Sequence, residues 1–476
     1  MNEATAKAAT EARELVVETA FDGQEIARLE TVGSSGIEAL LATAHGLHSD
    51  RDKWIPQPER IEILHRAAAI MKSRADKLAT DAAREGGKPL VDSQVEVARA
   101  IDGIENCIEV LRTEQGRVIP MNVNAASAGR VAFTRKEPIG VVAAVSAFNH
   151  PLNMGVHQVA PAVACGCPVL IKPASSTPMS VITFLGILEE AGLPPGWAQL
   201  ALTENSSVAT EMVTDERVSF FSFIGSARVG WMLRSKLAPG ARCGLEHGGA
   251  APVIVAKDAD IDGAVPILTK GGFYHGGQVC VSVQRVFAEK PVVEPLAKKL
   301  ADAAQNLVVG DPTDAKTEVG PLISAREVGR VHQWVEAAVA GGAKLLSGGE
   351  KLSPTTYAPT VLLDPPDDAE VSRKEVFGPV VCVYSCDSID SGIARANAVP
   401  FSFQSAVFTQ SIESAMRVYA RIKGSAVMIN DHTAFRVDWM PFAGLGVSGH
   451  GVGGMPGTMH EMQIEKMMVL RSNELL

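Results

Sequence analysis

Short apolar runs that alternate with helical segments constrain the fold of this sequence more than any other feature. The runs GVVAAVS and PVLIK have the length and composition of buried strands, and the segment between them has the spacing of a helix. In chain order, strands are expected over 140–146, 168–172, 200–203 and 218–223, and helices over 152–164, from Thr177 onward and over 206–213. Strands that alternate with helices predict a parallel, doubly wound α/β sheet.

Two features follow strands of this expected sheet, where open α/β sheets bind their ligands. Lys172 ends the strand PVLIK. The stretch Gly225–Gly230, GSARVG, follows the strand that ends at Phe223 and opens a helix, and the backbone N–H groups at a helix N-terminus suit a phosphate. The stretch is not GxGxxG, and a glycine at such a junction is often only a turn, so both interpretations stay open.

A second series of strands and helices follows Cys280 and predicts a second α/β domain. Its strands are expected over 281–287, 344–346, 359–364, 379–384 and 404–409, and its helices over 292–307, 326–339 and 411–422. Outside the two series, helices are expected over 34–85 and 90–113, a β-arm over 117–136, and an arm or edge strand over 460–473.

Composition and charge exclude several classes of protein. The 476 residues are too many for one hydrophobic core and suggest roughly two or three domains. Hydrophobic content of 46% and charged content of 21% are typical of a soluble globular chain. The formal net charge of −10 argues against a nucleic-acid partner and against an anionic membrane. No apolar run reaches the ~18 residues of a membrane span.

The cysteines imply neither disulfides nor a metal. Seven are scattered along the chain, an odd number without a framework. Cys165 and Cys167 are close together, but no second pair lies at zinc-finger spacing, so no structural metal is predicted. The N-terminus carries early acids and no apolar segment, unlike a signal peptide. We therefore expect a protein of the reducing cytoplasm.

Cys280, in the stretch FYHGGQVCVSVQR, is a candidate nucleophile. It follows Gly276 and Gly277, which let the backbone approach a reacting group closely, and it opens an alternating run that reads as a strand. A thiol at such a junction between loop and strand is placed like a nucleophile at the edge of a pocket. A buried structural cysteine is the alternative, because free cysteine behaves as a small hydrophobe.

Two acids lie close to glycines. Glu246, in LEHGG, is expected on a tight turn from which it could reach into a cleft, and an exposed loop acid is the alternative. Glu375 and Phe377, in EVFGP, lie two residues apart between two expected strands. They are either the lining of a cleft or part of a structural turn.

Taken in order, these residues and the words around them resemble the aldehyde dehydrogenase superfamily over nearly the whole chain. The words are EGGKP, AFNHPLN, IKPASSTP, FIGSARVG, LEHGG, GGQVCVSVQR, EVFGP and PFAGLGVSG. Each word is unspecific alone, but all of them in this order are specific. The words FNHPLN, CVSVQR and FRVD are most similar to the lactaldehyde and phosphonoacetaldehyde dehydrogenase-like branch.

The resemblance implies that a thiol oxidises an aldehyde with NAD or NADP. Cys280 would attack the carbonyl as a thiolate, which requires activation because a free thiol has a pKa of about 8.5. The Asn149 side-chain amide and the Cys280 N–H would form the oxyanion hole. Glu246 would activate the water that hydrolyses the thioester.

Alternatives within and beyond this class remain open at this point. Relatives that transfer the acyl group to coenzyme A lack a glutamate at the position of Glu246, so its presence favours release of the free acid. A coenzyme A-acylating or semialdehyde-specialised relative is one alternative. A non-catalytic, cofactor-binding member of the fold is the other, and it would be expected to have lost Cys280, Glu246 or Asn149.

The resemblance also implies the cofactor contacts and shows where the sequence departs from the family. The residues implied are Lys172 and Ser175 at the adenosine ribose, Gly225 and Ser226 at the pyrophosphate, and Glu375, Phe377 and His247 at the nicotinamide end. His247 stands where the family usually has leucine, and Gly446 where it has lysine; a histidine without a role is the alternative for His247. Ser175 stands where many NAD-preferring members carry a glutamate, so nothing there repels a 2′-phosphate and NADP stays open.

The substrate pocket is the least specific part of the resemblance. Its implied walls are His157, Val279, Val281, Arg436 and Phe442. Arg436 would pair either with an anionic substrate tail or, as a structural ion pair, with Asp438 or Asp431. The branch suggests a small aldehyde, which would be anionic if Arg436 pairs with the substrate and not with an aspartate.

By resemblance, the chain divides into three parts. Residues 1–116 and 139–247 would form a Rossmann-type NAD(P)-binding domain, and 248–446 an α/β catalytic domain. Residues 117–138 and 447–476 would form the arm and tail through which family members join as homodimers or homotetramers.

Overall fold

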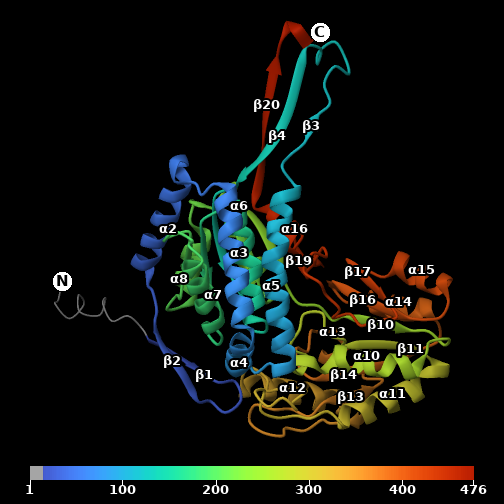
Figure 1. The fold of residues 1–476 in the computed structure, drawn as a ribbon. Helices are drawn as coiled ribbons and strands as arrows, with labels where there is room; N and C mark the ends of the chain where they lie inside the picture. The colour runs from blue at the N-terminus through green and yellow to red at the C-terminus, as the bar shows by residue number, and fades with distance from the viewer. Residues whose placement is uncertain (1–13, 476) are drawn as a thin grey trace, which may run out of the picture.

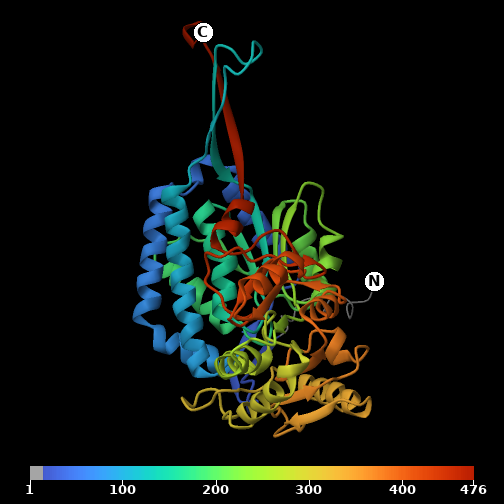
Figure 2. The same cartoon turned by 90° about the vertical axis from the view of Figure 1, so that its right-hand side faces the viewer.

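The computed structural model describes residues 14–475 as two α/β bodies and a projecting arm (Figure 1). Each body has one sheet with helices on its two faces, and the arm extends from the first body, as both views show (Figure 2). The predicted α/β class is therefore confirmed. The division of the chain at residues 116, 138, 247 and 446 stays a prediction.

A six-stranded sheet, in the order β19-β9-β8-β5-β6-β7, forms the centre of the first body. Its strands are β5 (Val141–Val145), β6 (Val169–Lys172), β7 (Ala198–Leu200), β8 (Val218–Ile224), β9 (Arg242–Glu246) and β19 (Gly449–His450). The pairs are parallel apart from β19 with β9. Within β5, Val142 and Ala144 pack into one hydrophobic cluster while Val141 and Ala143 pack into another, so both faces of the sheet are buried.

Helices of the first body pack on opposite faces of this sheet. One face carries α3 (Gln57–Ser73), α4 (Ala75–Gly86), α5 (Leu90–Thr113), α6 (Pro151–Cys165), α7 (Met179–Glu190) and α16 (Met455–Glu461). The other carries α2 (Ser34–Ser49), α8 (Ser206–Thr214) and α9 (Ala227–Arg234). The alternation of strands and helices predicted over this part of the chain is confirmed.

The second body is built on a seven-stranded sheet in the order β12-β13-β14-β11-β10-β16-β17. Its strands are β10 (Pro252–Val255), β11 (Arg285–Glu289), β12 (Lys344–Ser347), β13 (Thr360–Leu363), β14 (Val380–Cys386), β16 (Gln404–Phe408) and β17 (Ala426–Ile429). Its helices are α10 (Ile261–Phe273), α11 (Lys290–Gln305), α12 (Ala325–Ala340), α13 (Glu370–Arg373), α14 (Ile389–Ala396) and α15 (Ile412–Arg421). The pairs are parallel apart from β12 with β13.

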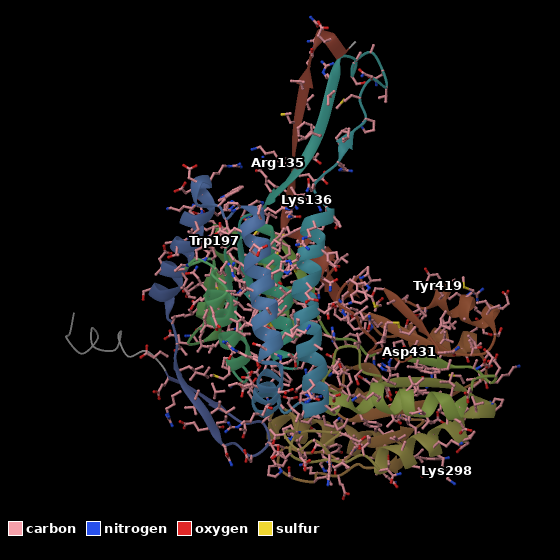
Figure 3. All side chains as sticks on the ribbon, viewed as in Figure 1. Arg135, Lys136, Trp197, Lys298, Tyr419 and Asp431 are labelled. Atoms are coloured by element: carbon pink, nitrogen blue, oxygen red, sulfur yellow. The ribbon has the colours of Figure 1, made fainter. Side chains whose placement is uncertain are left out.

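The arm is a three-stranded antiparallel sheet. Its central strand β4 (Arg130–Pro138) pairs with β3 (Val118–Ile119) on one side and with β20 (Gln463–Arg471) on the other. Strands were expected in both segments. Arg135 and Lys136, on β4, mark the base of the arm (Figure 3).

Three short pairings were not predicted. The hairpin of β1 (Glu14–Glu18) with β2 (Glu25–Glu30) precedes the first body, and β15 (Phe401–Ser402) pairs with β18 (Leu445–Gly446). β19 adds a C-terminal strand to the first sheet. Such short elements carry little periodic signal, so sequence patterns identify them poorly.

Candidate active site

A cavity of about 470 Å³ brings together residues from both bodies. The expected site residues that line it are Asn149, His157, Gly225, Ser226, Glu246, His247, Val279, Cys280, Val281, Glu375, Phe377, Arg436 and Phe442. Those from the first body follow β5, β8 and β9, whose carboxyl ends open at this edge of the parallel sheet. Lys172 ends β6 as expected, and Ser175 is exposed on the loop that follows, but neither is part of the cavity lining.

Cys280 lies in a turn, and the strand expected from Val281 is wrong. The backbone N–H of Ser282 donates to the carbonyl of Val279 over 3.0 Å, and β11 begins only at Arg285. Val281 and Val283 are both buried, at 4% and 1% exposure, and this alternation of burial imitates a strand in the sequence. The thiol is therefore presented by a turn at the cavity wall.

The segment before Cys280 has an unusual backbone. The 3₁₀ turn η3 (Tyr274–Gly277) contains three residues with positive φ: His275 at 50°, Gly276 at 61° and Gly277 at 70°. A Cβ atom on Gly277 would lie 2.1 Å from the carbonyl oxygen of Gly378. Gly277 is thus needed where the turn meets the backbone of another loop. The sequence predicted a close backbone approach at this glycine, but the backbone approaches another part of the protein and not a ligand.

The Asn149 side chain is held beside the Cys280 turn. Its Nδ2 atom donates to the carbonyl of Gln278 over 2.8 Å, and the residue is 7% exposed. Since an amide nitrogen has two protons, one remains for another acceptor. Asn149 follows β5 just before α6, whose N-terminal N–H groups at Leu152 and Asn153 donate to the buried carboxylate of Glu96.

Glu246 is the last residue of β9 and not part of a tight turn, so that expectation was wrong. The strand is held there by β19, with Glu246 paired to Gly449. A Cβ atom on Gly453 would lie 2.1 Å from Glu246 Oε1, so this carboxyl occupies the space that a side chain at 453 would take. Burial raises the pKa of Glu246, against the opposing charges of His157 and Arg436.

The electrostatic surroundings keep Cys280 protonated in this state. Burial raises the pKa of the Cys280 thiol, and the nearby carboxyls of Glu375 and Glu246 raise it further. The charge of Arg436 acts in the opposite direction. A base or an added positive charge is therefore required to form the thiolate.

Glu375 is packed against the Gly248-Gly249 loop. A Cβ atom on Gly248 would lie 1.8 Å from Glu375 Oε2, and the N–H of Gly249 donates to Oε1 over 3.2 Å. Burial raises the pKa of Glu375 to about 8. Phe377, with φ of 47°, packs its ring edge-on against Phe148, with ring centroids 5.8 Å apart. Glu375 and Phe377 both line the cavity, as expected if EVFGP forms the lining of a cleft.

His247 is packed into the first body. Its Nδ1 atom lies 3.0 Å from the carbonyl oxygen of Gly225, and its ring contacts Phe223 and Trp231 edge-on. A Cβ atom on Gly230 would lie 2.0 Å from its ring, so the imidazole fills the space that this glycine leaves. The ring therefore both lines the cavity and braces the N-terminal half of α9 against β9.

Arg436 lies on the loop before PFAG, where the sequence left open whether it pairs with an aspartate or with a substrate. Neither Asp438 nor Asp431 pairs with it, so the expected structural ion pair is wrong. Asp438 instead accepts from Arg99 Nη2 and His157 Nε2, each over 2.7 Å. Arg436 donates through Nη1 to the carbonyl of Met440 over 3.0 Å, and its buried Nη2 has no hydrogen-bond partner.

Sequence reasoning missed four polar residues of the cavity: Arg99, Ser146, His150 and Tyr274. Arg99 lies on α5, far from any word of the motif set, so no local pattern signals it. His150 and Tyr274 lie inside AFNHPLN and FYHGGQVC, directly beside recognised positions. They could have been found there by asking which polar side chains flank the nucleophile.

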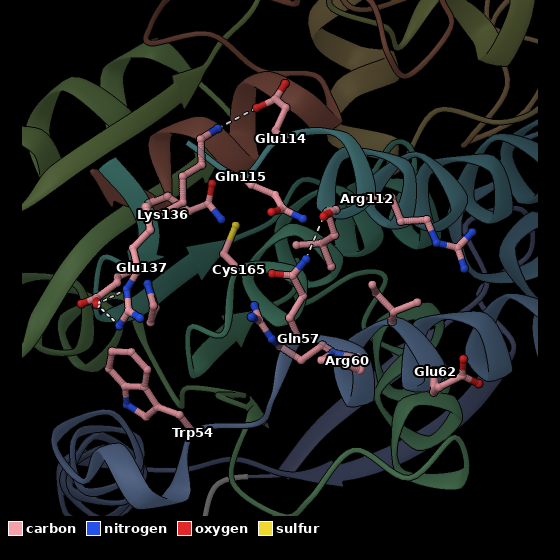
Figure 4. A pocket seen from close by; sticks show the side chains of 16 residues that line it. Trp54, Gln57, Arg60, Glu62, Arg112, Glu114, Gln115, Lys136, Glu137 and Cys165 are labelled. Carbon is pink, nitrogen blue, oxygen red and sulfur yellow. Dashed lines mark hydrogen bonds and ion pairs between the residues drawn. The ribbon is translucent and has the colours of Figure 1, made fainter. Parts of the chain in front are cut away.

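A larger cavity, of about 670 Å³, lies at the base of the arm and has different chemistry (Figure 4). Two of its three acids are paired: Glu137 with Arg51 over 2.8 Å and Glu114 with Lys136 over 2.6 Å. Cys165, which lines it, is buried, and burial raises the pKa of its thiol well above the usual range. The Cys165 thiol also donates to the carbonyl of Met459 over 3.4 Å, as a structural cysteine does, whereas the predicted nucleophile Cys280 lines the smaller cavity.

Residues 14–475 contain neither a metal-binding cluster nor a helix that could span a membrane. No group of three His, Cys, Asp or Glu side chains in this part of the chain is arranged to hold a metal ion. None of its helices is both long and apolar enough to cross a bilayer. All seven cysteines are free thiols.

Comparison with known proteins identifies the class. The aldehyde dehydrogenase family model matches residues 7–468. The chain is 37% identical to 3-sulfolactaldehyde dehydrogenase of Priestia aryabhattai over 87% of this chain and 86% of that protein. It is 35% identical to lactaldehyde dehydrogenase of Methanocaldococcus jannaschii, over 88% and 89%. The crystal structure of glyceraldehyde-3-phosphate dehydrogenase from that organism, complexed with NADP, matches with a TM-score of 0.92 at 33% identity, over 97% of this chain and 100% of that one.

The chain belongs to the aldehyde dehydrogenase family. The family and fold expected from the ordered sequence words are thereby confirmed, as is the class of enzyme, an aldehyde dehydrogenase.

Proposed function

We propose that the protein oxidises a small, anionic aldehyde to the carboxylic acid with NAD⁺ or NADP⁺. The observation that carries the proposal is the content of one cavity. It holds the thiol of Cys280 with Asn149 and Glu246 beside it, and a guanidinium, that of Arg436, which makes no ion pair within residues 14–475. The first set suits attack on a carbonyl, and the guanidinium suits an anionic substituent.

The residues along the first body suit the cofactor. Ser226 is the N-cap of α9, with an extended backbone and no side-chain cap, so N–H groups of the first turn remain for a pyrophosphate. Gly225 and Ser226 would hold that group, and Lys172 with Ser175 the adenosine ribose. Glu375, Phe377 and His247 would line the nicotinamide end. NAD(P)⁺, when bound, supplies the acceptor for the hydride that the substrate carbon loses.

Cys280 would act as the nucleophile. Its sulfur attacks the aldehyde carbon, and the carbonyl oxygen becomes an oxyanion. The free proton of Asn149 Nδ2 and the Cys280 N–H would donate to that oxygen, since Asn149 is already oriented by its bond to Gln278. The raised pKa of the thiol means that attack has to be preceded by loss of its proton.

Glu246 would complete the reaction as a general base. It takes a proton from a water molecule, the hydroxide adds to the Cys280 thioester carbon, and the C–S bond breaks to release the carboxylic acid and the thiol. Burial supports this role because a carboxyl with a raised pKa is a stronger base than an exposed one.

The anionic preference rests on how charges are shared in the cavity. Asp438 is paired with Arg99 and hydrogen-bonded to His157, which leaves the charge of Arg436 without a carboxylate. The buried, unpartnered Nη2 atom of Arg436 is costly unless something accepts from it. A carboxylate, sulfonate or phosphate on the substrate would do so.

The proposal is tested with a panel of aldehydes, assayed with NAD⁺ and NADP⁺ separately. We expect the highest kcat/KM with short aldehydes that carry a carboxylate, sulfonate or phosphate, and lower values with their uncharged analogues. A preference for long apolar aldehydes would contradict it. The lack of a carboxylate at Ser175 leads us to expect turnover with NADP⁺.

We also propose that the protein is a homodimer or homotetramer joined through the arm, with the arm and tail segments as a separate part of the chain. The arm exposes apolar side chains on β4 and β20: Phe133, Met467, Met468, Val469 and Leu470. β20 and β17 each have a free edge, and α15 beside β17 exposes Ile412, Met416 and Tyr419 (Figure 3). Two such edges suit pairing between copies. A monomer in analytical ultracentrifugation would contradict this.

A further inference from the structure

Tyr274 and His150 form a polar pair in the wall of the cavity that holds Cys280. The Tyr274 hydroxyl lies 3.4 Å from His150 Nε2, and the two rings meet edge-on. The other side chains around this part of the cavity include Met154, Val279 and Phe442, which have no hydrogen-bonding group to offer. The pair is therefore a polar feature in a largely apolar wall.

The pair is fixed by its surroundings. His150 is the N-cap residue of α6, 7% exposed, and the helix start is held by the buried carboxylate of Glu96, which Lys88 pairs. The ring of His275 packs edge-on against His150, with centroids 6.0 Å apart. The ring of Tyr274 lies under the ammonium of Lys270, 5.6 Å from its centroid. Neither ring can turn away without disturbing these contacts.

The pair is also uncharged. Burial holds the pKa of His150 well below its ordinary value, and the charge of Lys88 adds to this effect. Burial raises the pKa of Tyr274. In the tautomer in which His150 Nε2 carries the ring proton and donates to the phenol oxygen, the Tyr274 hydroxyl keeps its own proton to donate and a lone pair to accept.

Few polar groups in this part of the cavity are free to bind substrate. Arg99 and His157 are committed to Asp438. Beyond the groups proposed for the reaction and the cofactor, what remains is Nη2 of Arg436, a cationic donor, and the hydroxyl of Tyr274, a neutral donor and acceptor. The Ser146 hydroxyl also lines the cavity without a partner, but Ser146 is bonded through its backbone to Lys172, on the side proposed for the cofactor. A group that both donates and accepts is best matched by another hydroxyl.

We infer that Tyr274, oriented by His150, recognises a hydroxyl on the substrate, which makes the preferred substrate a short anionic aldehyde with a hydroxyl group near the carbonyl. This inference rests on the proposed function, because it assigns the second recognition group of the same cavity. Arg436 would bind the anionic group of the substrate, and Tyr274 would discriminate the hydroxylated aldehyde from its deoxy analogue.

The experiment compares two matched pairs of aldehydes: 3-sulfolactaldehyde with 3-sulfopropanal, and lactaldehyde with propanal. For the unmodified enzyme we expect kcat/KM to favour the hydroxylated member of each pair by about tenfold or more. Tyr274→Phe removes only the hydroxyl, so it is expected to abolish this preference while it changes kcat/KM for the deoxy members by less than about threefold. Tyr419→Phe, on the outer surface of α15, is the matched control and is expected to keep the preference.

A second variant guards against a merely structural effect. His150→Phe keeps an aromatic ring at the start of α6 but frees the Tyr274 hydroxyl, and we expect it to weaken the preference while leaving the deoxy members oxidised. Loss of activity that is equal for both members of a pair in Tyr274→Phe overturns the inference. Equal kcat/KM for both members in the unmodified enzyme also overturns it and leaves the proposed function standing. Failure to oxidise any of the four aldehydes overturns both.

Discussion

The turn around Cys280 and the loop around Arg436 face the same cavity but are held in different ways. The Cys280 turn is held by backbone geometry: positive φ angles at residues 275–277, a glycine pressed against the Gly378 carbonyl, and a bond from Asn149 to the Gln278 carbonyl. The Arg436 loop is held by charges from distant helices, since Asp438 binds Arg99 of α5 and His157 of α6.

This difference separates the groups proposed for the reaction from the group proposed for substrate specificity. A turn that depends on backbone approach tolerates few residue types, so the reacting groups recur as recognisable short words. A loop that depends on how ion pairs are shared can change its free charge when a single partner changes, because the remaining guanidinium then lacks a carboxylate. The first arrangement suits a constant reaction and the second a variable substrate.

The strongest test of the Cys280 region removes its sulfur. We expect Cys280→Ala to lower kcat by at least about a thousandfold, because no other thiol lines the cavity and the covalent route is lost. The formation of reduced cofactor measures this. Cys243→Ala, which removes a thiol outside the cavity, is the control and should retain turnover. Undiminished oxidation by Cys280→Ala would end the claim that this turn carries the chemistry.

Removing the base tests a later step of the same region. In Glu246→Gln we expect a burst of reduced cofactor followed by a steady-state rate about a hundredfold lower, because the thioester forms but its hydrolysis lacks a general base. Rapid-mixing kinetics separate the two phases. An unaffected steady-state rate would mean that the base lies elsewhere.

The Arg436 loop is tested by removing its free charge. We expect Arg436→Gln to lower kcat/KM for anionic aldehydes by about 10- to 100-fold, the worth of a charge-assisted hydrogen bond, and to change it little for neutral ones. Arg421→Gln, an exposed arginine of α15, is the matched control. Equal losses for charged and neutral substrates would show that Arg436 supports the loop and does not read the anion.

A smaller effect concerns the buried carboxyl beside Cys280. The pKa of Glu375 is raised by burial to about 8, so the folded protein binds this proton more tightly than the unfolded chain does. The free energy of unfolding therefore falls as pH rises from about 4.5 to about 8. Relative to the unmodified protein, we expect Glu375→Gln to gain stability steadily across that window, by about 1.4 kcal/mol for each pH unit at most. Denaturant unfolding at several pH values measures it, and a constant difference would contradict the burial of an ionisable Glu375.

Much of the fold followed from periodicity. The runs of buried strands in the first body predicted β5, β6 and β8, because both faces of a parallel sheet are covered and its strands are apolar throughout. The same reasoning failed after Cys280, where Val281 and Val283 are buried by tertiary packing within a turn. Alternating burial therefore does not by itself identify a strand, and β11 itself is buried throughout.

The amino-acid sequence alone determined the class of this protein and predicted its reacting groups, because those groups need particular side chains at particular backbone sites. It did not determine which charge in the cavity stays free. Asp438 had three candidate partners in Arg99, His157 and Arg436, and only the packing of α5 and α6 against the loop decided that it binds the first two. The reason is physical: an ion pair depends on distances of a few ångströms between residues that lie hundreds of positions apart, and no local pattern encodes such distances.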